Sequence, residues 1–359
     1  MANKVFNKKN AKNYSAYLIV IIAYAAVLLL DFAGGLPSMY KGLLVPICAY
    51  IVMALSLNLT VGILGELSLG HAGFMSAGAF TGVAISIALK DSVTVAWLRL
   101  VIAMICGAVV AAVFGFIIGI PVLRLKGDYL AIVTLAFGEI IKTIFTNLYL
   151  GLDAEGWLRI GLVNKPESLG EGSKMLINGT LGISGVEKIS TFTAGAVLLI
   201  LALIIIFNTV KSRTGRAILA IRDNRIAAEC MGINITKYKM TAFVLSAAIA
   251  GAAGALYSLN FSTITANKFD FNTSILILVF VVLGGQGNMI GSMIAATVLT
   301  ILPEALRQFA DYRMLVYAIV LIIIMLVTNN PTIKGYTDKL VKSLKEKLKK
   351  NKTAVKEGK

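Results

Sequence analysis

The feature that most constrains this chain is a series of uncharged apolar runs that recur along almost its whole length. Examples are YLIVIIAYAAVLLL in residues 17–30 and LLILALIIIF in residues 198–207. A helix needs about 20 such residues to cross a hydrocarbon core ~30 Å thick. Because lipid gives the backbone no hydrogen-bond partner, we expect these runs to be helical. They lack the alternation of a transmembrane β-barrel, so that fold is rejected.

Composition agrees with an integral membrane protein. Of 359 residues, 58% are hydrophobic and 14% are charged, against roughly 25% charged in soluble domains. Lysines before the first run resemble a signal-peptide n-region, but no A-x-A-like site follows, so the run is interpreted as a retained span. Cys48, Cys106 and Cys230 lack metal-ligand spacing. We expect no disulfide framework, metal site or cofactor.

The distribution of charge predicts how the chain is oriented. The N-terminal arm carries four lysines and no acid, residues 211–239 carry seven basic residues against two acids, and residues 329–359 carry ten lysines against three acids. Residues 150–190 hold four basic and five acidic residues. The positive-inside rule therefore places the three basic segments in the cytosol and residues 150–190 outside. Because membrane orientation accounts for the basic charge, no nucleic-acid partner is expected.

Ten spans satisfy this orientation, with both termini cytoplasmic. The expected spans are 16–33, 43–59, 71–89, 98–120, 129–149, 192–210, 240–260, 272–284, 289–303 and 314–328. Residues 272–303 could instead form one re-entrant pair, which would leave eight spans. The fold class is thus an all-α polytopic membrane protein, with a cytosolic arm (1–15), a transmembrane domain (16–328) and a Lys-rich cytosolic tail (329–359).

Small residues at four-residue spacing predict where the helices pack. Without a hydrophobic gain in lipid, close association needs small side chains that let backbones approach. The sets are Gly107, Ala111, Gly115 and Gly119; Gly78, Gly82 and Ser86; and Ala247, Gly251 and Ala255. We interpret them as packing seams, with the lining of a substrate path as the alternative.

Two Gly-rich stretches interrupt the apolar pattern. TVGILGELSLGHAGF, residues 60–74, has four glycines, and LGGQGNMIG, residues 283–291, has four more. Each Gly costs a helix about 1 kcal/mol relative to Ala, so broken segments are predicted. Broken helices present free backbone groups to substrates in transporters. The alternative is a structural turn in which Glu66 caps a half-helix.

A charged pair is predicted inside the fifth span. Glu139 lies roughly 15 Å along that span, and Lys142 follows on the same face. Charge at this depth costs on the order of 3 kcal/mol and should face the bundle interior. A structural pair and a role on the substrate path both remain open. The candidate path residues are Glu66, Ser68, His71, Glu139, Gln286 and Asn288.

The loop 211–239 contains RAILAIRDNRIAAECMG, which predicts one or two short helices ending near Gly232. Apolar residues could form a face for a partner protein on them. These residues are Ala217, Ile218, Ile221, Ala228 and Met231. A solvated positive-inside anchor is the alternative.

Several stretches in one order resemble a known family. They are residues 54–80, 124–142, 178–186, the loop with its continuation TAFVLSAAIAGAAGALYS, and residues 280–296. Together they are similar to permeases of branched-chain amino acid ATP-binding cassette importers, and YLAIVTLAFGEI resembles the M-type subunit. The resemblance implies a type II importer-like bundle. Two departures are the long outer segment 150–190 and the Lys-rich tail, which could bind anionic lipid or serve as a disordered, solubilising extension.

The resemblance implies partners rather than an enzyme. These are a second, H-type permease, two cytosolic ATPases and an extracellular binding protein, and no G-x-x-x-x-G-K-[ST] motif is present in the chain itself. The implied ATPase contacts are Gly215, Arg216, Ala220, Arg222, Asp223, Asn224, Ala227, Ala228, Met231 and Gly232. Bulky replacement of Ala228 or Gly232 should abolish transport without unfolding. An ion-coupled secondary transporter or a channel is the rival, and a membrane enzyme lacks a recognisable constellation.

Overall fold

The computed structural model describes residues 2–34, 37–90, 92–125, 127–152, 158–162 and 174–306, and the isolated positions 315, 318, 319 and 322. Two compact units are distinguished, residues 1–300 and 301–359. Every helix and strand given below begins in the first unit. The tenth expected span, 314–328, is described only at the four isolated positions, and the tail 329–359 lies outside the described residues.

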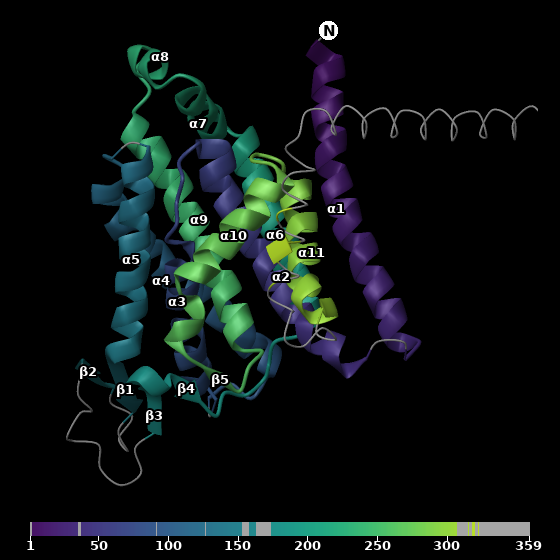
Figure 1. The fold of residues 1–359 in the computed structure, drawn as a ribbon, viewed down its shortest axis with the longest axis vertical. Helices are drawn as coiled ribbons and strands as arrows, with labels where there is room; N and C mark the ends of the chain where they lie inside the picture. Colours follow the sequence, from purple (N-terminus) through teal and green to yellow (C-terminus); the bar gives the residue numbers. More distant parts are fainter. Residues whose placement is uncertain are drawn as a thin grey trace, which may run out of the picture. The chain divides into compact units, whose positions relative to one another are not determined.

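The described residues form a bundle of long apolar helices, which confirms the helical polytopic fold (Figure 1). Seven helical stretches are long and apolar enough to cross a membrane. The long helices are α1 (Ala2–Phe32), α2 (Ser38–Asn58), α3 (His71–Ala88), α4 (Ala96–Val122), α5 (Asp128–Asn147), α6 (Phe192–Lys211) and α9 (Ile235–Ser258). Two shorter apolar helices follow, α10 (Phe271–Gly284) and α11 (Met289–Ala305). The number of spans, eight or ten, stays a prediction.

The two ends of the bundle differ. At one end lie the start of α1 and two short helices, α7 (Arg213–Asp223) and α8 (Arg225–Cys230); at the other lie the strands (Figure 1). One antiparallel sheet, in the order β2-β1-β3, is formed by β1 (Leu148–Leu152), β2 (Leu158–Leu162) and β3 (Lys174–Asn178). A second, two-stranded sheet pairs β4 (Ile183–Ser184) with β5 (Thr263–Ile264). The all-α prediction missed these strands, because they are short pairings within polar connections.

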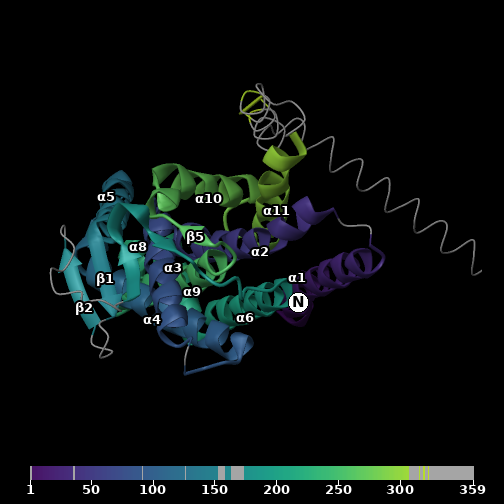
Figure 2. The ribbon, with the colours of Figure 1, turned by 90° about the horizontal axis from the view of Figure 1, so that it is seen from below.

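Helices α3, α4 and α9 pack closely against one another, with α4 at the edge of the bundle (Figure 2). A Cβ added to Gly78 would meet the backbone of Gly251, and one added to Gly107 would lie 2.9 Å from the carbonyl oxygen of Gly78. A Cβ on Gly251 would meet the Ala111 side chain. The predicted small-residue seam is therefore present, and we call these three glycines the seam.

Both Gly-rich stretches break helices. Helix α2 runs on as a π-helix (Leu59–Leu64), which ends at Gly65 in the left-handed region with φ of 79°. Residues 65–70, the first break, have no helical or strand structure before α3 begins at His71. Residues 285–288, the second break, connect α10 to α11 with φ of 88° at Gly285 and 78° at Gly287. Glycine adopts these positive φ values without steric cost, which explains where the helices stop.

Candidate coupling site and interrupted helices

The α7–α8 hairpin, residues 213–232, is shaped by its caps. Ser212 accepts a hydrogen bond from the Gly215 N–H at the start of α7, and Asn224 accepts one from the Ala227 N–H at the start of α8. Such side chains satisfy N–H groups that lack a partner in the first turn. After α8, Gly232 turns the chain with φ of 76°. The two short helices ending near Gly232 are thus as predicted.

The apolar face predicted on this hairpin is largely wrong. Ile221 and Ala228 are buried, and they pack with Ile235 at the start of α9. Ile218 is also buried. The sequence shows that an apolar stripe exists but not that this chain's own helices cover it. The large apolar side chains that remain exposed are Ile226, at 76%, and Met231, at 82%.

The ten predicted contact residues therefore divide by burial. Gly215 and Ala228 are buried, and the exposed ones are Arg216, Ala220, Arg222, Asp223, Asn224, Ala227, Met231 and Gly232. A Cβ on Gly215 would collide with the backbone carbonyls of Thr209 and Val210 at the end of α6. Because Ala228 is buried, a bulky group there would meet the packing of the hairpin, and the expectation that such a variant stays folded remains a prediction.

Arg222 connects the hairpin to the membrane helices. Its Nη1 donates to the carbonyl oxygen of Gly62 in the π-helix at 3.0 Å, and its Nε and Nη2 donate to Asp223 Oδ1. A Cβ on Gly65 would lie 2.6 Å from Arg222 Cγ, so the methylenes of this arginine lie on the glycine that opens the first break. No pattern in the sequence predicts this contact, which joins positions 160 residues apart.

Asn58 joins the two breaks. It is fully buried, its Oδ1 accepts from the Gly287 N–H at 2.8 Å, and its Nδ2 donates to Ser292 Oγ at 2.9 Å. A Cβ on Gly62 would collide with Asn58 Oδ1 and the Gly287 backbone. We call Asn58, Gly62, Arg222, Gly287 and Ser292 the polar junction. The two Gly-rich stretches therefore lie in contact with each other in the folded chain.

The first break is held by polar contacts to three helices. Glu66 forms an ion pair with Lys239 of α9, whose side chain is 3% exposed. The Leu69 N–H donates to Thr134 Oγ1 of α5 at 3.0 Å. The Ala72 N–H donates to Ser274 Oγ of α10 at 3.1 Å. Glu66 pairs with Lys239, and the N-cap residue of α3, Gly70, makes no side-chain cap bond, so Glu66 is not seen to cap α3, while a structural turn stays the alternative to a role on the path.

His71 lies in the core of the bundle. Its side chain is fully buried, and Nε2 lies 2.8 Å from Ser56 Oγ of α2 and 3.1 Å from Ser246 Oγ of α9. Ser68 is also buried, and its Oγ has no hydrogen-bond partner among the described residues. Neither side chain reaches the surface of this chain.

Glu139 and Lys142 form the predicted pair, with 2.9 Å between Oε2 and Nζ. Glu139 Oε1 also accepts from the N–H of Phe271, which begins α10, at 3.1 Å. The two side chains are 37% and 20% exposed on this chain. A structural role for the pair is supported, and its partial exposure keeps a role on the path as a prediction.

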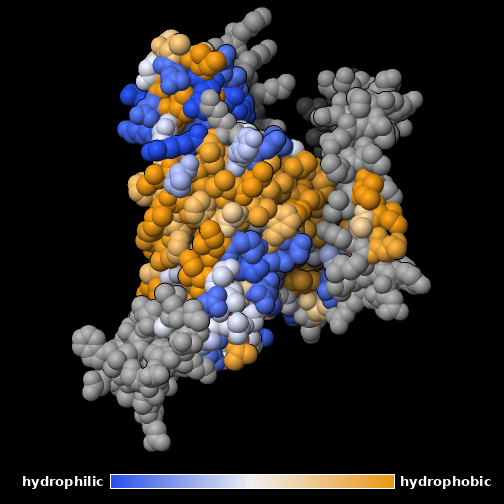
Figure 3. Space-filling model, turned by 60° about the vertical axis from the view of Figure 1, so that its left-hand side comes forward, coloured by the Kyte–Doolittle hydropathy of each residue, from blue (hydrophilic) through white to orange (hydrophobic). Residues whose placement is uncertain are grey.

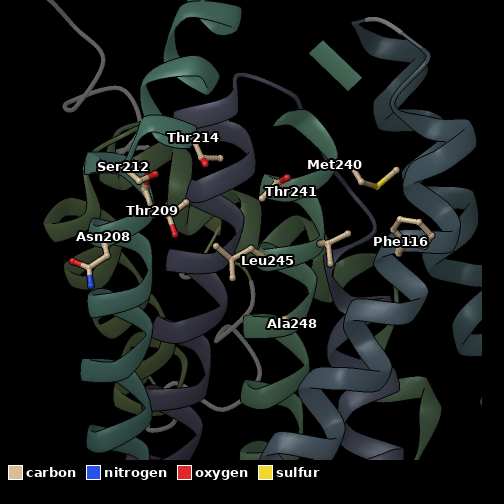
Figure 4. Close-up of a pocket in the computed structure, with 10 residues that line it drawn as sticks. Phe116, Asn208, Thr209, Ser212, Thr214, Met240, Thr241, Leu245 and Ala248 are labelled. Atoms are coloured by element: carbon tan, nitrogen blue, oxygen red, sulfur yellow. The ribbon is translucent and has the colours of Figure 1, made fainter. Parts of the chain in front are cut away.

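The six candidate path residues differ in burial. Gln286 is exposed and Asn288 half-buried in the second break, whereas His71 and Ser68 are buried. An open pocket beside the hairpin lies between α4, α6 and α9 and is lined by Phe116, Asn208, Thr209 and Thr241 among others (Figure 4), but by none of the six. Within the described residues, no group of three His, Cys, Asp or Glu could hold a metal.

A family match decides what kind of chain carries these features. The model of the branched-chain amino acid transport system, permease component, matches residues 39–325. The chain belongs to this permease family. No solved structure matches it.

Curated relatives of this permease include both subunit types. It is 34% identical over 289 residues to the high-affinity branched-chain amino acid transport system permease protein LivM of Salmonella typhimurium, covering 77% of this chain and 66% of LivM. The matched region is thus just under two thirds of that relative's length. It is 26% identical over 307 residues to LivH of the same organism, covering 83% of this chain and 94% of LivH. The higher identity confirms the resemblance to the M-type subunit.

One more relative carries a different substrate in its name. The nucleoside ABC transporter permease protein NupC of Lactococcus lactis is 25% identical over 239 residues, which covers 65% of this permease and 70% of NupC. Relatives of this permease are therefore named for amino acids and for nucleosides.

Proposed function

We propose that this chain is the M-type permease subunit of an ATP-binding cassette importer for branched-chain or related amino acids. It forms half of the membrane path and is driven by two cytosolic ATPases, with an extracellular binding protein delivering the substrate. The observation that carries the proposal, beyond the family itself, is the α7–α8 hairpin. It offers exposed apolar side chains outward and is bonded to the membrane helices inward through Arg222.

Charge supports a cytosolic hairpin. The N-terminal arm and the hairpin are basic segments at one end of the bundle, and the strands lie at the other (Figure 1). By the positive-inside rule, we propose that the arm and hairpin lie on the cytoplasmic side of a cell membrane, with residues 150–190 on the outer side. We propose that the exposed Ile226 and Met231 insert into the ATPases, because apolar anchors surrounded by polar residues are typical of docking surfaces.

A partly polar face among the membrane helices supports the proposal that a second permease binds this chain. Figure 3 shows a wide hydrophobic belt and a hydrophilic patch that enters the belt from the end opposite the hairpin. Separately, Glu139 lies in the middle of α5 and is partly exposed, and Asn272 at the start of α10 is exposed. Charge facing lipid at this depth would cost on the order of 3 kcal/mol. We infer that an H-type permease covers this face, with Glu139 beside the shared path.

The test uses the transporter reconstituted in proteoliposomes with its second permease, ATPases and binding protein. Radiolabelled leucine should enter only with the binding protein outside and ATP on the ATPase side. Ile226→Asp and Met231→Asp should each lower uptake about tenfold or more, as the loss of an interface anchor does. Leu181→Asp is the matched control, because Leu181 is 67% exposed at the strand end.

Two results would contradict the proposal. Uptake driven by a proton or sodium gradient without ATP would favour a secondary transporter. Normal uptake in both hairpin variants would remove the hairpin from the ATPase interface. If ATP and the binding protein are required but leucine is not taken up, the class stands and the substrate is wrong.

A further inference from the structure

The polar junction brings together three parts of the chain that are far apart in sequence. It contains the end of α7, the π-helix that continues α2, and the turn between α10 and α11. We propose that this junction carries movement of the α7–α8 hairpin into both breaks, and that Arg222 is its positioning residue. The inference rests on the proposed function and says which atoms transmit it.

Arg222 is suited to this role because it meets the π-helix at its C-terminal end. The last carbonyl groups of a helix lack partners within the helix, and a cation there interacts favourably with the helix dipole. The carbonyl group of Gly62 is one of these, and its oxygen accepts a hydrogen bond from Arg222 Nη1 at 3.0 Å. Asp223 holds the other edge of the guanidinium through Nε and Nη2, so its orientation is fixed from the hairpin side.

Gly62 is tightly packed within the polar junction. Any side chain there would collide with Asn58 Oδ1 and with the backbone of Gly287. Gly62 therefore contacts both Arg222 and Gly287 directly. Close-packed interiors transmit displacement because they contain few voids that could absorb it. A shift of Arg222 thus reaches the second break through a single residue.

The first break is connected to the hairpin twice. Arg222 packs on Gly65, and the next residue, Glu66, pairs with Lys239 near the start of α9. Helix α9 follows α8 directly and packs on the hairpin through Ile235. The first break is therefore held by the guanidinium of Arg222, in the middle of the hairpin, and by the ammonium group of Lys239 on α9, the helix that follows the hairpin.

The experiment replaces Arg222 in the complete reconstituted transporter. Arg222→Gln should lower the leucine taken up per ATP hydrolysed about tenfold, the size expected for losing a charged hydrogen bond, measured on complexes that are first shown to retain their ATPases. Arg222→Lys keeps one donor and should restore part of the loss. Arg213→Gln removes the same charge from the exposed first residue of α7, and it should behave as wild type.

A second readout does not depend on the substrate. A cysteine at Gln286, exposed in the second break, is placed in a background without native cysteines and labelled with a maleimide. Trapping with ATP and vanadate should change the labelling rate in wild type and in Arg213→Gln. The change should be absent in Arg222→Gln.

Each outcome of these two experiments either supports or overturns the inference. An unchanged uptake per ATP, or a normal labelling response, in Arg222→Gln would overturn the inference. Loss of assembly or stability in that variant beyond Arg213→Gln would make Arg222 a structural residue and would overturn it too. Failure of the proposed function is separate, since it appears in the wild-type transporter as uptake that does not need ATP.

Discussion

The seam and the two breaks are held together in different ways. At the seam, Gly78, Gly107 and Gly251 bring backbones into contact with no polar side chain between them. At the breaks, close backbone contacts such as Gly62 on Gly287 are joined by directional pairs, such as Glu66 with Lys239 and Asn58 with Gly287. A backbone contact has one close-packed arrangement, whereas single hydrogen bonds can be exchanged one at a time. We therefore expect α3, α4 and α9 to act as a fixed frame and the segments at the breaks to be adjustable.

The strongest test of this difference places a side chain in the seam. Gly251→Leu should cost about 3 kcal/mol or more of unfolding free energy, because its Cβ would meet Ala111 and Gly107 and overpacking of a tight core is costly. Thermal unfolding in detergent, followed by size-exclusion chromatography, measures it. Gly42→Leu is the control, since nothing lies within 4 Å of a Cβ there. Equal stability of both variants would show that the seam is not tightly packed.

The next test breaks the ion pair of the first break. Glu66→Gln leaves Lys239, 3% exposed, without its charge partner and should cost about 3 kcal/mol, as for other buried pairs. Lys239→Met should cost less, because the Glu66 side chain is 17% exposed. The double variant should recover most of the loss. Additive losses in this cycle would mean that the pair contributes nothing specific.

These features differ in how far the sequence predicts them. Span 192–210 was predicted almost to the residue, because α6 (Phe192–Lys211) is uniformly apolar between polar ends. The pairing of Glu139 with Lys142 followed from spacing on one helix, and the break at residues 65–70 followed from glycine density. Each of these depends on local pattern alone.

Contacts between remote segments were not predictable in the same way. Lys239 was counted only as a cytoplasmic charge, yet it is buried against Glu66, 173 residues earlier. Ile218 and Ile221 formed a recognisable apolar stripe, but helical period does not say whether the chain itself or a partner covers it. The Arg222 contact with Gly62 requires that α7 fold back over α2, which no spacing along the chain encodes.

A smaller effect is expected where the first break meets α5. Thr134→Val removes the acceptor of the Leu69 N–H, and an unsatisfied buried donor costs about 1–3 kcal/mol. Thr146→Val, which loses only a bond to the Lys142 carbonyl of its own helix, should cost less. Melting temperatures of the two variants compare them. If Thr146→Val is the more damaging, the contact of the first break with α5 is not a stabilising one.

The smallest effect is expected at the N-terminus of α10, which follows strand β5. Asp270 Oδ1 accepts from the Thr273 N–H at 3.0 Å, so Asp270→Ala should cost about 1 kcal/mol, the usual value of an N-cap. Asp270→Asn keeps the acceptor and should retain most of that stability. If α10 is one of the adjustable segments, Asp270→Ala should also change leucine uptake more than Thr146→Val does. The reason is that loss of the cap loosens α10 and leaves the seam intact. A transporter in which Asp270→Ala loses stability but transports normally would assign α10 to the fixed frame instead.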